Sequence, residues 1–132
     1  MKRHQVAVPT FVALFLAHAS TRLVRRYVVE GRSMLRAFAP GDRLLVEGLS
    51  YRLRPPRVGE VMVISRLADA TRLDIKRVAA GPSSTVMVGA EERVLVPDEW
   101  YVLGDNLSES QDSRKLGPVR TKDVVGRVWL KY

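Results

Sequence analysis

The chain has 132 residues, with 22 Lys or Arg against 14 Asp or Glu, which gives a formal net charge of +8. This length allows one domain with one hydrophobic core. The absence of cysteine excludes disulfides, thiolate catalysis and Cys-ligated zinc. A nucleic-acid partner and anionic lipid headgroups would both fit this charge. The positive residues are scattered and are not interleaved with aromatic residues, so we expect no nucleic-acid partner and favour the membrane.

The N-terminus carries a basic leader at residues 1–4, and residues 6–24 are mainly apolar. A membrane-spanning helix needs about 20 such residues, so one interpretation is a single membrane anchor with its leader in the cytoplasm. A second is a cleaved secretory signal, with a small-x-small site at Ala17-His18-Ala19. A third is a packed soluble helix. We expect residues 1–26 to form the leader and an apolar anchor helix.

From residue 27 onward, short β-favouring segments alternate with turns rich in Gly, Pro and Asp. The expected strands cover residues 27–30, 43–47, 58–64, 73–78, 85–88, 93–96, 100–103 and 124–130. A β-hairpin is expected at about residues 82–98. Connecting loops are expected at residues 49–57, 66–71 and 104–117. Many short strands predict a mainly β domain, a compact barrel or sandwich, over residues 27–132.

Ser33 is a candidate nucleophile, because it lies in a turn between Gly31 and Met34. Most serines in such turns only hydrogen-bond their own backbone. The two histidines, His4 and His18, lie in the N-terminal leader and apolar segment, which disfavours a Ser-His-Asp triad. Without cysteine or a cluster of metal-ligating side chains, thiol and metal mechanisms are also disfavoured, and no cofactor is expected. Lysine remains as the base, as in known Ser-Lys enzymes.

Lys76 is the candidate base. It lies on an alternating segment and points to the face opposite Ile75 and Arg77. To act near neutral pH, its amine needs a pKa lowered from ~10.4 to about 7–8 by desolvation. The alternative is a lysine that extends from a strand into solvent. The other lysines lie in the leader, in loops or at the C-terminus.

A third candidate segment, residues 104–114, is dense in short polar side chains that can cross-link a turn. Asp112 and Arg114 can form an ion pair, and the Ser110 hydroxyl can hydrogen-bond a neutral amine. The alternative is a solvated turn with local side-chain bonds.

Together and in this order, the three segments resemble the signal peptidase I family, the Ser/Lys endopeptidases of bacterial membranes. Gly31-Arg32-Ser33-Met34 resembles the nucleophile box of that family, and Ile75-Lys76-Arg77-Val78 resembles its lysine box. A third stretch resembles the C-terminal box of the family: Gly104-Asp105-Asn106, followed by Ser110-Gln111-Asp112-Ser113-Arg114. The likeness covers most of the chain, and it implies that the cap domain of the family is reduced here to the hairpin at about residues 82–98.

The resemblance implies a catalytic Ser33 nucleophile and a catalytic Lys76 general base. It further implies that the Ser33 backbone N–H donates to the oxyanion. The implied supporting residues hold the Lys76 amine or brace the loops of the site, and they are Ser110, Asp112, Arg114, Gly31 and Asp105.

Two positions depart from the family pattern. Arg36 and Ala37 stand where proline and threonine are common, so the turn that aims Ser33 lacks its usual rigid residue. Arg36 also places a charge near the expected peptide groove.

In that family the substrate is an extended segment laid beside a β-strand, with small side chains at the first and third positions before the cut. We expect Met34, Val63 and Ile64 to line the apolar groove that selects such side chains. The partners implied are precursor proteins with small-x-small sites and the lipid bilayer.

The expected protein is a membrane-anchored serine endopeptidase that cleaves signal peptides from exported precursors. It would be a single-pass protein of the inner or plasma membrane, with its catalytic domain on the extracytoplasmic side. Three alternatives stay open: a maturation peptidase dedicated to one precursor, an inactive peptide-binding β-domain, and a self-cleaving domain of an SOS-type repressor. The repressor would need a DNA-binding domain and an internal cleavage segment, and the sequence offers neither.

Overall fold

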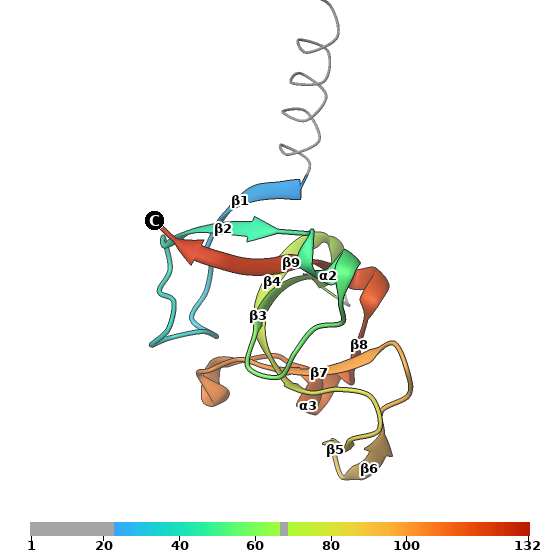
Figure 1. Cartoon of the computed structure of the whole chain (residues 1–132). Helices are drawn as coiled ribbons and strands as arrows, with labels where there is room; N and C mark the ends of the chain where they lie inside the picture. The colour runs from blue at the N-terminus through green and yellow to red at the C-terminus, as the bar shows by residue number, and fades with distance from the viewer. Residues whose placement is uncertain (1–22, 67–68) are drawn as a thin grey trace, which may run out of the picture.

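The computed structural model describes residues 23–66 and 69–132 (Figure 1). Within these residues the strands are β1 (Val24–Val28), β2 (Arg43–Glu47), β3 (Val61–Arg66), β4 (Asp69–Ala80), β5 (Thr85–Val88), β6 (Glu91–Val94), β7 (Glu99–Leu103), β8 (Val119–Arg120) and β9 (Val124–Lys131). The helical elements are α2 (Ser50–Leu53), α3 (Ser113–Leu116) and the 3-10 turns η1 (Leu107–Glu109) and η2 (Thr121–Asp123).

The expected N-terminal anchor helix lies outside the described residues. Across residues 23–66 and 69–132, no helix combines the length and the apolar character that a membrane crossing requires.

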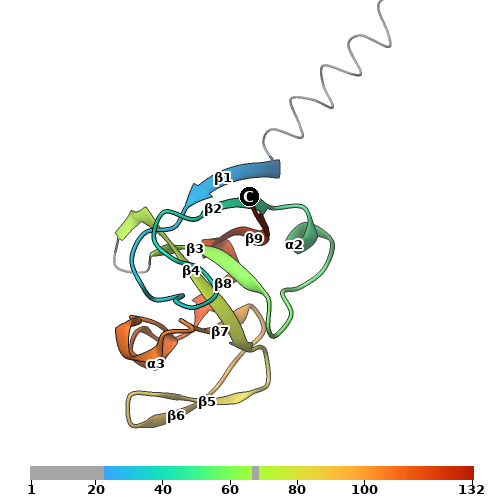
Figure 2. The same cartoon turned by 90° about the vertical axis from the view of Figure 1, so that its left-hand side faces the viewer.

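Seven strands form one sheet in the order β1-β2-β9-β3-β4-β7-β8, and β5 and β6 form a separate two-stranded hairpin. Neighbouring strands pair antiparallel, with register shifts in the β2/β9, β3/β4, β3/β9 and β4/β7 pairs. Such irregularities bend and twist a sheet. Figures 1 and 2 show the result: β1, β2 and β9 lie at one end of the domain, and β7, β8 and the hairpin lie at the other. The predicted mainly β class is confirmed.

Apolar side chains cover both faces of the central strands β3 and β4. On one face, Val63 and Ile75 pack in a cluster that also holds Val29, Met34, Leu44, Val46 and Val61. On the other face, Met62, Ile64 and Val78 pack in a cluster with Trp100, Val102 and Val119. Successive strand residues point to opposite faces, so Lys76, which pairs with Met62, lies on the face of the second cluster.

The structure corrects several expected boundaries. The strands at residues 43–47 and 85–88 are confirmed at both ends, and the other expected strands are displaced by a few residues. The expected loop at residues 66–71 is largely strand, since β3 runs to Arg66 and β4 begins at Asp69. Helices α2 and α3 lie inside two other expected loops, and strand β8 was not expected. Elements of two to four residues are too short to show a hydrophobic period and depend on tertiary contacts.

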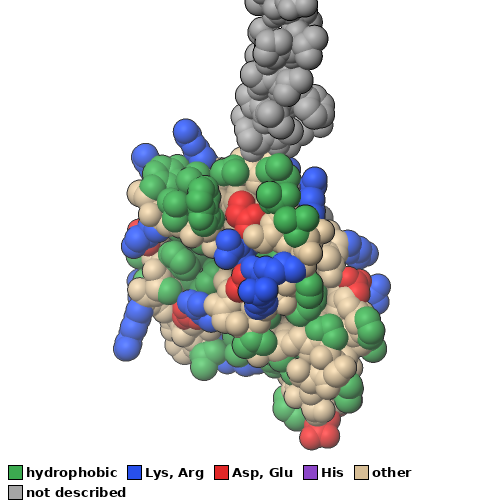
Figure 3. All heavy atoms as spheres, in the orientation of Figure 1, with side chains coloured by type: hydrophobic (Ala, Val, Ile, Leu, Met, Phe, Trp, Pro, Cys, Tyr) green, Lys and Arg blue, Asp and Glu red, His purple; other side chains and the backbone are tan. Residues whose placement is uncertain are grey.

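Charged and hydrophobic side chains are intermixed over the face of the molecule shown in Figure 3. Strands β1 and β9 nevertheless expose several large apolar side chains, among them Val24, Val28 and Trp129, which is 57% exposed. This end of the domain therefore has a partly hydrophobic surface. Strand β1 also begins at Val24, ahead of the boundary expected at residue 27.

Candidate active site

Ser33 lies in a tight turn that is anchored on both sides. Before it, Val29 is buried, and its backbone N–H donates to Asp42 O at 2.9 Å. Gly31 follows with a φ of +72°, in the left-handed region that glycine tolerates. After it, Met34 is only 1% exposed. The backbone therefore holds Ser33 at the edge of the first apolar cluster.

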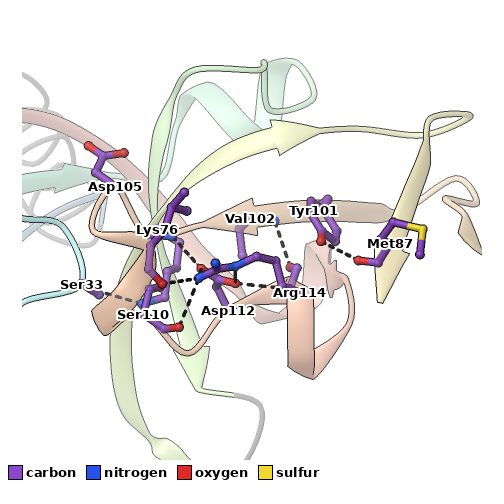
Figure 4. Close-up of polar contacts among 12 residues, drawn as sticks. Ser33, Lys76, Met87, Tyr101, Val102, Asp105, Ser110, Asp112 and Arg114 are labelled. Carbon is purple, nitrogen blue, oxygen red and sulfur yellow. Dashed lines mark hydrogen bonds and ion pairs between the residues drawn. The ribbon is translucent and has the colours of Figure 1, made fainter. Parts of the chain in front are cut away.

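Lys76 reaches this turn from the middle of β4. Its Nζ donates to Ser33 Oγ at 2.9 Å (Figure 4). Lys76 is only 4% exposed, and it lies beside Met62 and Val78 of the second apolar cluster. The structure thus brings together the two residues that the sequence suggested as nucleophile and base, although they are 43 positions apart in the chain.

The loop after β7 packs directly against the serine turn. A Cβ at Gly104 would lie 2.6 Å from the Cβ of Ser110 and 2.6 Å from Ser33 O, so no larger residue fits without displacing the turn. The Gly104 backbone N–H donates to Asp112 Oδ2 at 3.0 Å. Gly104 therefore allows close contact between this loop and the backbone of Ser33.

Asp112 and Arg114 brace this loop. The Asp112 side chain is 1% exposed, and Arg114 Nε donates to its Oδ1 at 2.8 Å. Arg114 Nη2 also donates to Leu107 O at 2.7 Å. Burial alone would raise the pKa of Asp112, but hydrogen bonds from Arg114 and from Gly104 N–H lower it below its ordinary value. Asp112 is therefore held as a carboxylate.

Replacing Asp112 by asparagine is expected to destabilise the domain by about 1.5–3 kcal/mol at pH 7, because it weakens the hydrogen bonds that Arg114 and the Gly104 N–H donate to the buried carboxylate. Since the folded-state pKa of Asp112 is lowered, its contribution is present above the ordinary carboxyl pKa and is lost as the pH falls through the lowered value. The difference in unfolding free energy between wild type and variant should therefore shrink as the pH drops below about 3.8. Urea unfolding at pH 7 and at pH 3 measures this; an equal difference at both values would contradict it.

Asp105 ties the same loop to β4. Its two carboxylate oxygens accept from Arg77 Nε at 2.9 Å and Arg77 Nη2 at 2.8 Å, and Arg77 Nη1 donates to Gly59 O. Such a two-point contact fixes orientation as well as distance. Arg77 is the neighbour of Lys76 in β4, so this pair positions the loop beside the lysine.

Ser110 lies beneath Gly104, and its hydroxyl is buried. Its Oγ makes no hydrogen bond to any described residue, the Lys76 amine included. The expected role of Ser110 in holding that amine therefore stays a prediction.

The three residues expected to line the substrate groove lie on two different faces of the sheet. Met34 and Val63 are enclosed in the first apolar cluster. Ile64 belongs to the second cluster and lines a small cavity together with Lys76 and Asp112. Val63 and Ile64 are consecutive in β3, so they cannot point to one side.

The sequence analysis gave no separate role to Asn106 or Glu109. In the structure, Asn106 N–H donates to Ser33 O at 2.8 Å, and Glu109 accepts from Arg32 Nε at 2.9 Å. For Asn106, its position inside the C-terminal box could have suggested a role in the site. For Glu109, nothing in the sequence suggests such a role.

Within residues 23–66 and 69–132, no group of three or more acidic or histidine side chains could hold a metal ion. The chemistry offered by the described site residues is that of a hydroxyl, a buried amine and backbone N–H groups. A hydroxyl beside a lysine amine is the arrangement of serine peptidases that use lysine in place of histidine.

Comparison with known proteins identifies the family. The family model described as signal peptidase, peptidase S26 matches residues 2–101 and 85–132. The chain is 31% identical to the probable signal peptidase I-1 of Synechocystis sp., over 92% of this chain and 78% of that protein. It is 34% identical to the mitochondrial ATP-independent inner membrane protease subunit 1a of Arabidopsis thaliana, over 89% and 76% of the two chains. It is 29% identical to the signal peptidase I of Bacillus caldolyticus, over 94% and 88%. The chain belongs to the signal peptidase family, peptidase S26.

Proposed function

We propose that this chain is a serine endopeptidase in which Ser33 is the nucleophile and Lys76 the general base. The observation that carries the proposal is the 2.9 Å contact between Lys76 Nζ and Ser33 Oγ. With the amine uncharged, the same contact lets the hydroxyl proton pass from Oγ to Nζ as Oγ attacks a peptide carbonyl.

The burial of Lys76 supports an uncharged amine. Its side chain is 4% exposed and packs beside apolar residues of β3 and β4. Removing an ammonium group from water disfavours its charged form. A buried lysine can therefore act as a base where an exposed one stays protonated.

The proposed reaction runs in two halves. Ser33 Oγ bonds to the scissile carbon while its proton moves to Lys76 Nζ, and the Ser33 backbone N–H donates to the carbonyl oxygen as it becomes negative. Cleavage of the C–N bond releases the new N-terminus, which takes the proton from Lys76 and leaves an ester on Ser33. A water molecule then gives a proton to Lys76 and attacks the ester, and the proton returns to Ser33 Oγ as the acid is released.

An unpaired strand edge beside the dyad supports a peptide substrate. Val78 N–H donates to Glu60 O at 2.9 Å, toward β3. Backbone groups alternate sides along a strand, so those of Leu73 and Ile75 point to the opposite edge. Strand β7 pairs with β4 only from Arg77 onward, so this edge has no strand partner among the described residues. An extended peptide could therefore add to β4 next to Ser33.

Part of this edge is already engaged. The Leu73 carbonyl accepts from the Tyr27 hydroxyl at 3.3 Å. A carbonyl oxygen accepts two hydrogen bonds, so the contact and a bound peptide are compatible.

The same placement rationalises a preference for small residues before the cut. The first and third residues of an extended peptide point to one side. We assign that side to the first apolar cluster, where Met34 and Val63 would form the floor of the groove, with Ile64 on the opposite face beside Lys76. Because Met34 and Val63 are 1% exposed, little depth is left for a large side chain.

The substrates proposed are precursor proteins with small-x-small sites, and the action is removal of signal peptides. The support is the family and its named relatives, which include signal peptidases and a thylakoidal processing peptidase. Membrane attachment through the apolar residues before position 23 fits this role, with the exposed apolar side chains of β1 and β9 resting on the lipid surface. The proposed location is the inner or plasma membrane, single-pass, with the catalytic domain extracytoplasmic.

A narrower function is a maturation peptidase dedicated to one precursor. It would use the same site and chemistry, and it differs from a general signal peptidase only in the breadth of its substrates.

Cleavage of defined precursors tests the function. The full chain in detergent would be incubated with a precursor carrying alanine at the first and third positions before the cut, and mass spectrometry would locate the cleaved bond. We expect a single cut after the alanine. Matched precursors with phenylalanine at either position should be cut at least about tenfold more slowly, because an added large side chain overfills a closed pocket. Equal cleavage of all precursors would contradict the proposed groove, and cleavage of only one natural precursor in a panel would favour the dedicated peptidase.

A further inference from the structure

Asn106 contacts the backbone of the serine turn twice. Its backbone N–H donates to Ser33 O at 2.8 Å, and its side-chain Nδ2 donates to Arg32 O at 3.1 Å. Two successive carbonyl groups are thus bound by one residue of the opposing loop. Within the turn itself, Leu35 N–H also donates to Arg32 O at 3.2 Å. Asn106 is the partner that holds this carbonyl from outside the turn.

The orientation of the Asn106 amide is fixed by its neighbours. Nδ2 also donates to Glu109 Oε2 at 2.9 Å, and Oδ1 accepts from Ser108 Oγ at 3.3 Å. The side of the amide that faces two acceptors must be the NH₂ group. Glu109 Oε2 in turn accepts from Arg32 Nε at 2.9 Å. The three side chains of Arg32, Glu109 and Asn106 therefore form one connected brace across the two loops.

This brace acts on the peptide unit that contains the proposed oxyanion donor. Arg32 C=O and Ser33 N–H belong to the same planar unit, and in a trans peptide they point in opposite directions. A bond that fixes Arg32 O therefore also fixes the direction of the Ser33 N–H. That N–H donates to no described residue, so it is available to a substrate oxygen. Rotation of this peptide would turn the donor away from the substrate.

We propose that Asn106 is a positioning residue that aims the Ser33 N–H at the developing oxyanion, with Glu109 and Arg32 holding its amide in place. The inference rests on the proposed function, because it needs Ser33 to be the nucleophile. It assigns a role in the transition state to a residue that does not touch the substrate.

The variant Asn106→Ala keeps the backbone N–H and removes only the side-chain bonds. Loss of an oxyanion donor costs roughly 10²–10³ in kcat, so loss of its positioning group should lower kcat by about 10–100-fold with KM changed less than about threefold. A peptide aldehyde of the substrate sequence, which forms a tetrahedral adduct with a serine, should lose affinity by a similar factor. An uncleavable peptide of the same sequence should bind as it does to wild type.

Ser83→Ala is the control, because it removes an exposed hydroxyl in the turn before β5, outside the brace, and its kcat should stay within about threefold of wild type. Glu109→Gln keeps an acceptor for Asn106 and should retain more activity than Glu109→Ala. Asn106→Asp, which turns a carboxylate toward Arg32 O and Glu109, should lose at least as much kcat as Asn106→Ala and serves if the alanine variant does not fold.

Wild-type kcat and aldehyde affinity in both Asn106 variants would overturn the inference. So would equal losses of aldehyde and uncleavable-peptide binding, because a general disturbance of the site produces that pattern. A wild-type enzyme whose cleavage does not depend on Ser33 would instead refute the proposed function, so the two failures are distinguishable.

Discussion

Replacing Ser33 by alanine is expected to reduce kcat/KM for precursor cleavage by at least about 10⁴-fold, as removal of the nucleophile does in other serine hydrolases. The reason is chemical, because the Ser33 hydroxyl that contacts Lys76 Nζ at 2.9 Å is the proposed nucleophile. The substitution removes one oxygen from a partly exposed side chain and leaves the backbone contact to Asn106 intact. The measurement is the initial rate of precursor cleavage, followed by gel and mass spectrometry.

The matched control is Ser83→Ala, which removes the hydroxyl of an exposed serine in the turn before β5. It should cleave at the wild-type rate. Substantial cleavage by Ser33→Ala at the same bond, with the control unchanged, would remove Ser33 from the mechanism.

Replacing Lys76 by methionine is expected to lower kcat by about 10²–10⁴-fold, the usual contribution of a general base. Methionine has a similar length and no charge, and the site is apolar on the side of Met62 and Val78. The substitution also changes the stability of the domain, because it removes the hydrogen-bonding end of a buried side chain. Cleavage rates and urea unfolding curves measured on one preparation separate the two effects.

Lys76→Arg tests separately whether position 76 must act as a base, because a guanidinium stays protonated and cannot accept the proton. It should be as inactive as Lys76→Met. The matched control is Lys115→Met on the exposed surface of α3, which should keep wild-type activity. Activity in Lys76→Arg would mean that the side chain supplies only a positive charge.

The strands of this domain were predictable where local chemistry decides them. The segments at residues 43–47 and 85–88 are β-favouring and bounded by turn residues, and both strands formed there. The end of β3 and the start of β4 were not predictable, because Arg66 and Asp69 are polar and extend the strands through pairing with each other. Helix α2 is also a tertiary effect, since Tyr51 packs on the second apolar cluster.

The site was predictable only in part. Composition left lysine as the one available base, but the meeting of Ser33 and Lys76 depends on pairing between distant strands, so only the resemblance to a family suggested it. The close approach at Gly104 and the brace through Asn106 and Glu109 depend on how two loops pack. Val63 and Ile64 are consecutive in β3, so the alternation of side chains along a strand already places them on opposite faces, and this rule needs only the sequence.

Restoring a lost amine tests the central claim most directly. The chain has no cysteine, so Lys76→Cys creates a unique thiol. Bromoethylamine converts that thiol into a lysine-like amine, and iodoacetamide adds a side chain of similar length without a basic group. We predict that Lys76→Cys is inactive, that aminoethylation restores cleavage, and that the iodoacetamide product stays inactive. Cleavage at the wild-type rate by unmodified Lys76→Cys, or equal activity of the two alkylated products, would contradict a mechanism in which Lys76 takes the proton from Ser33.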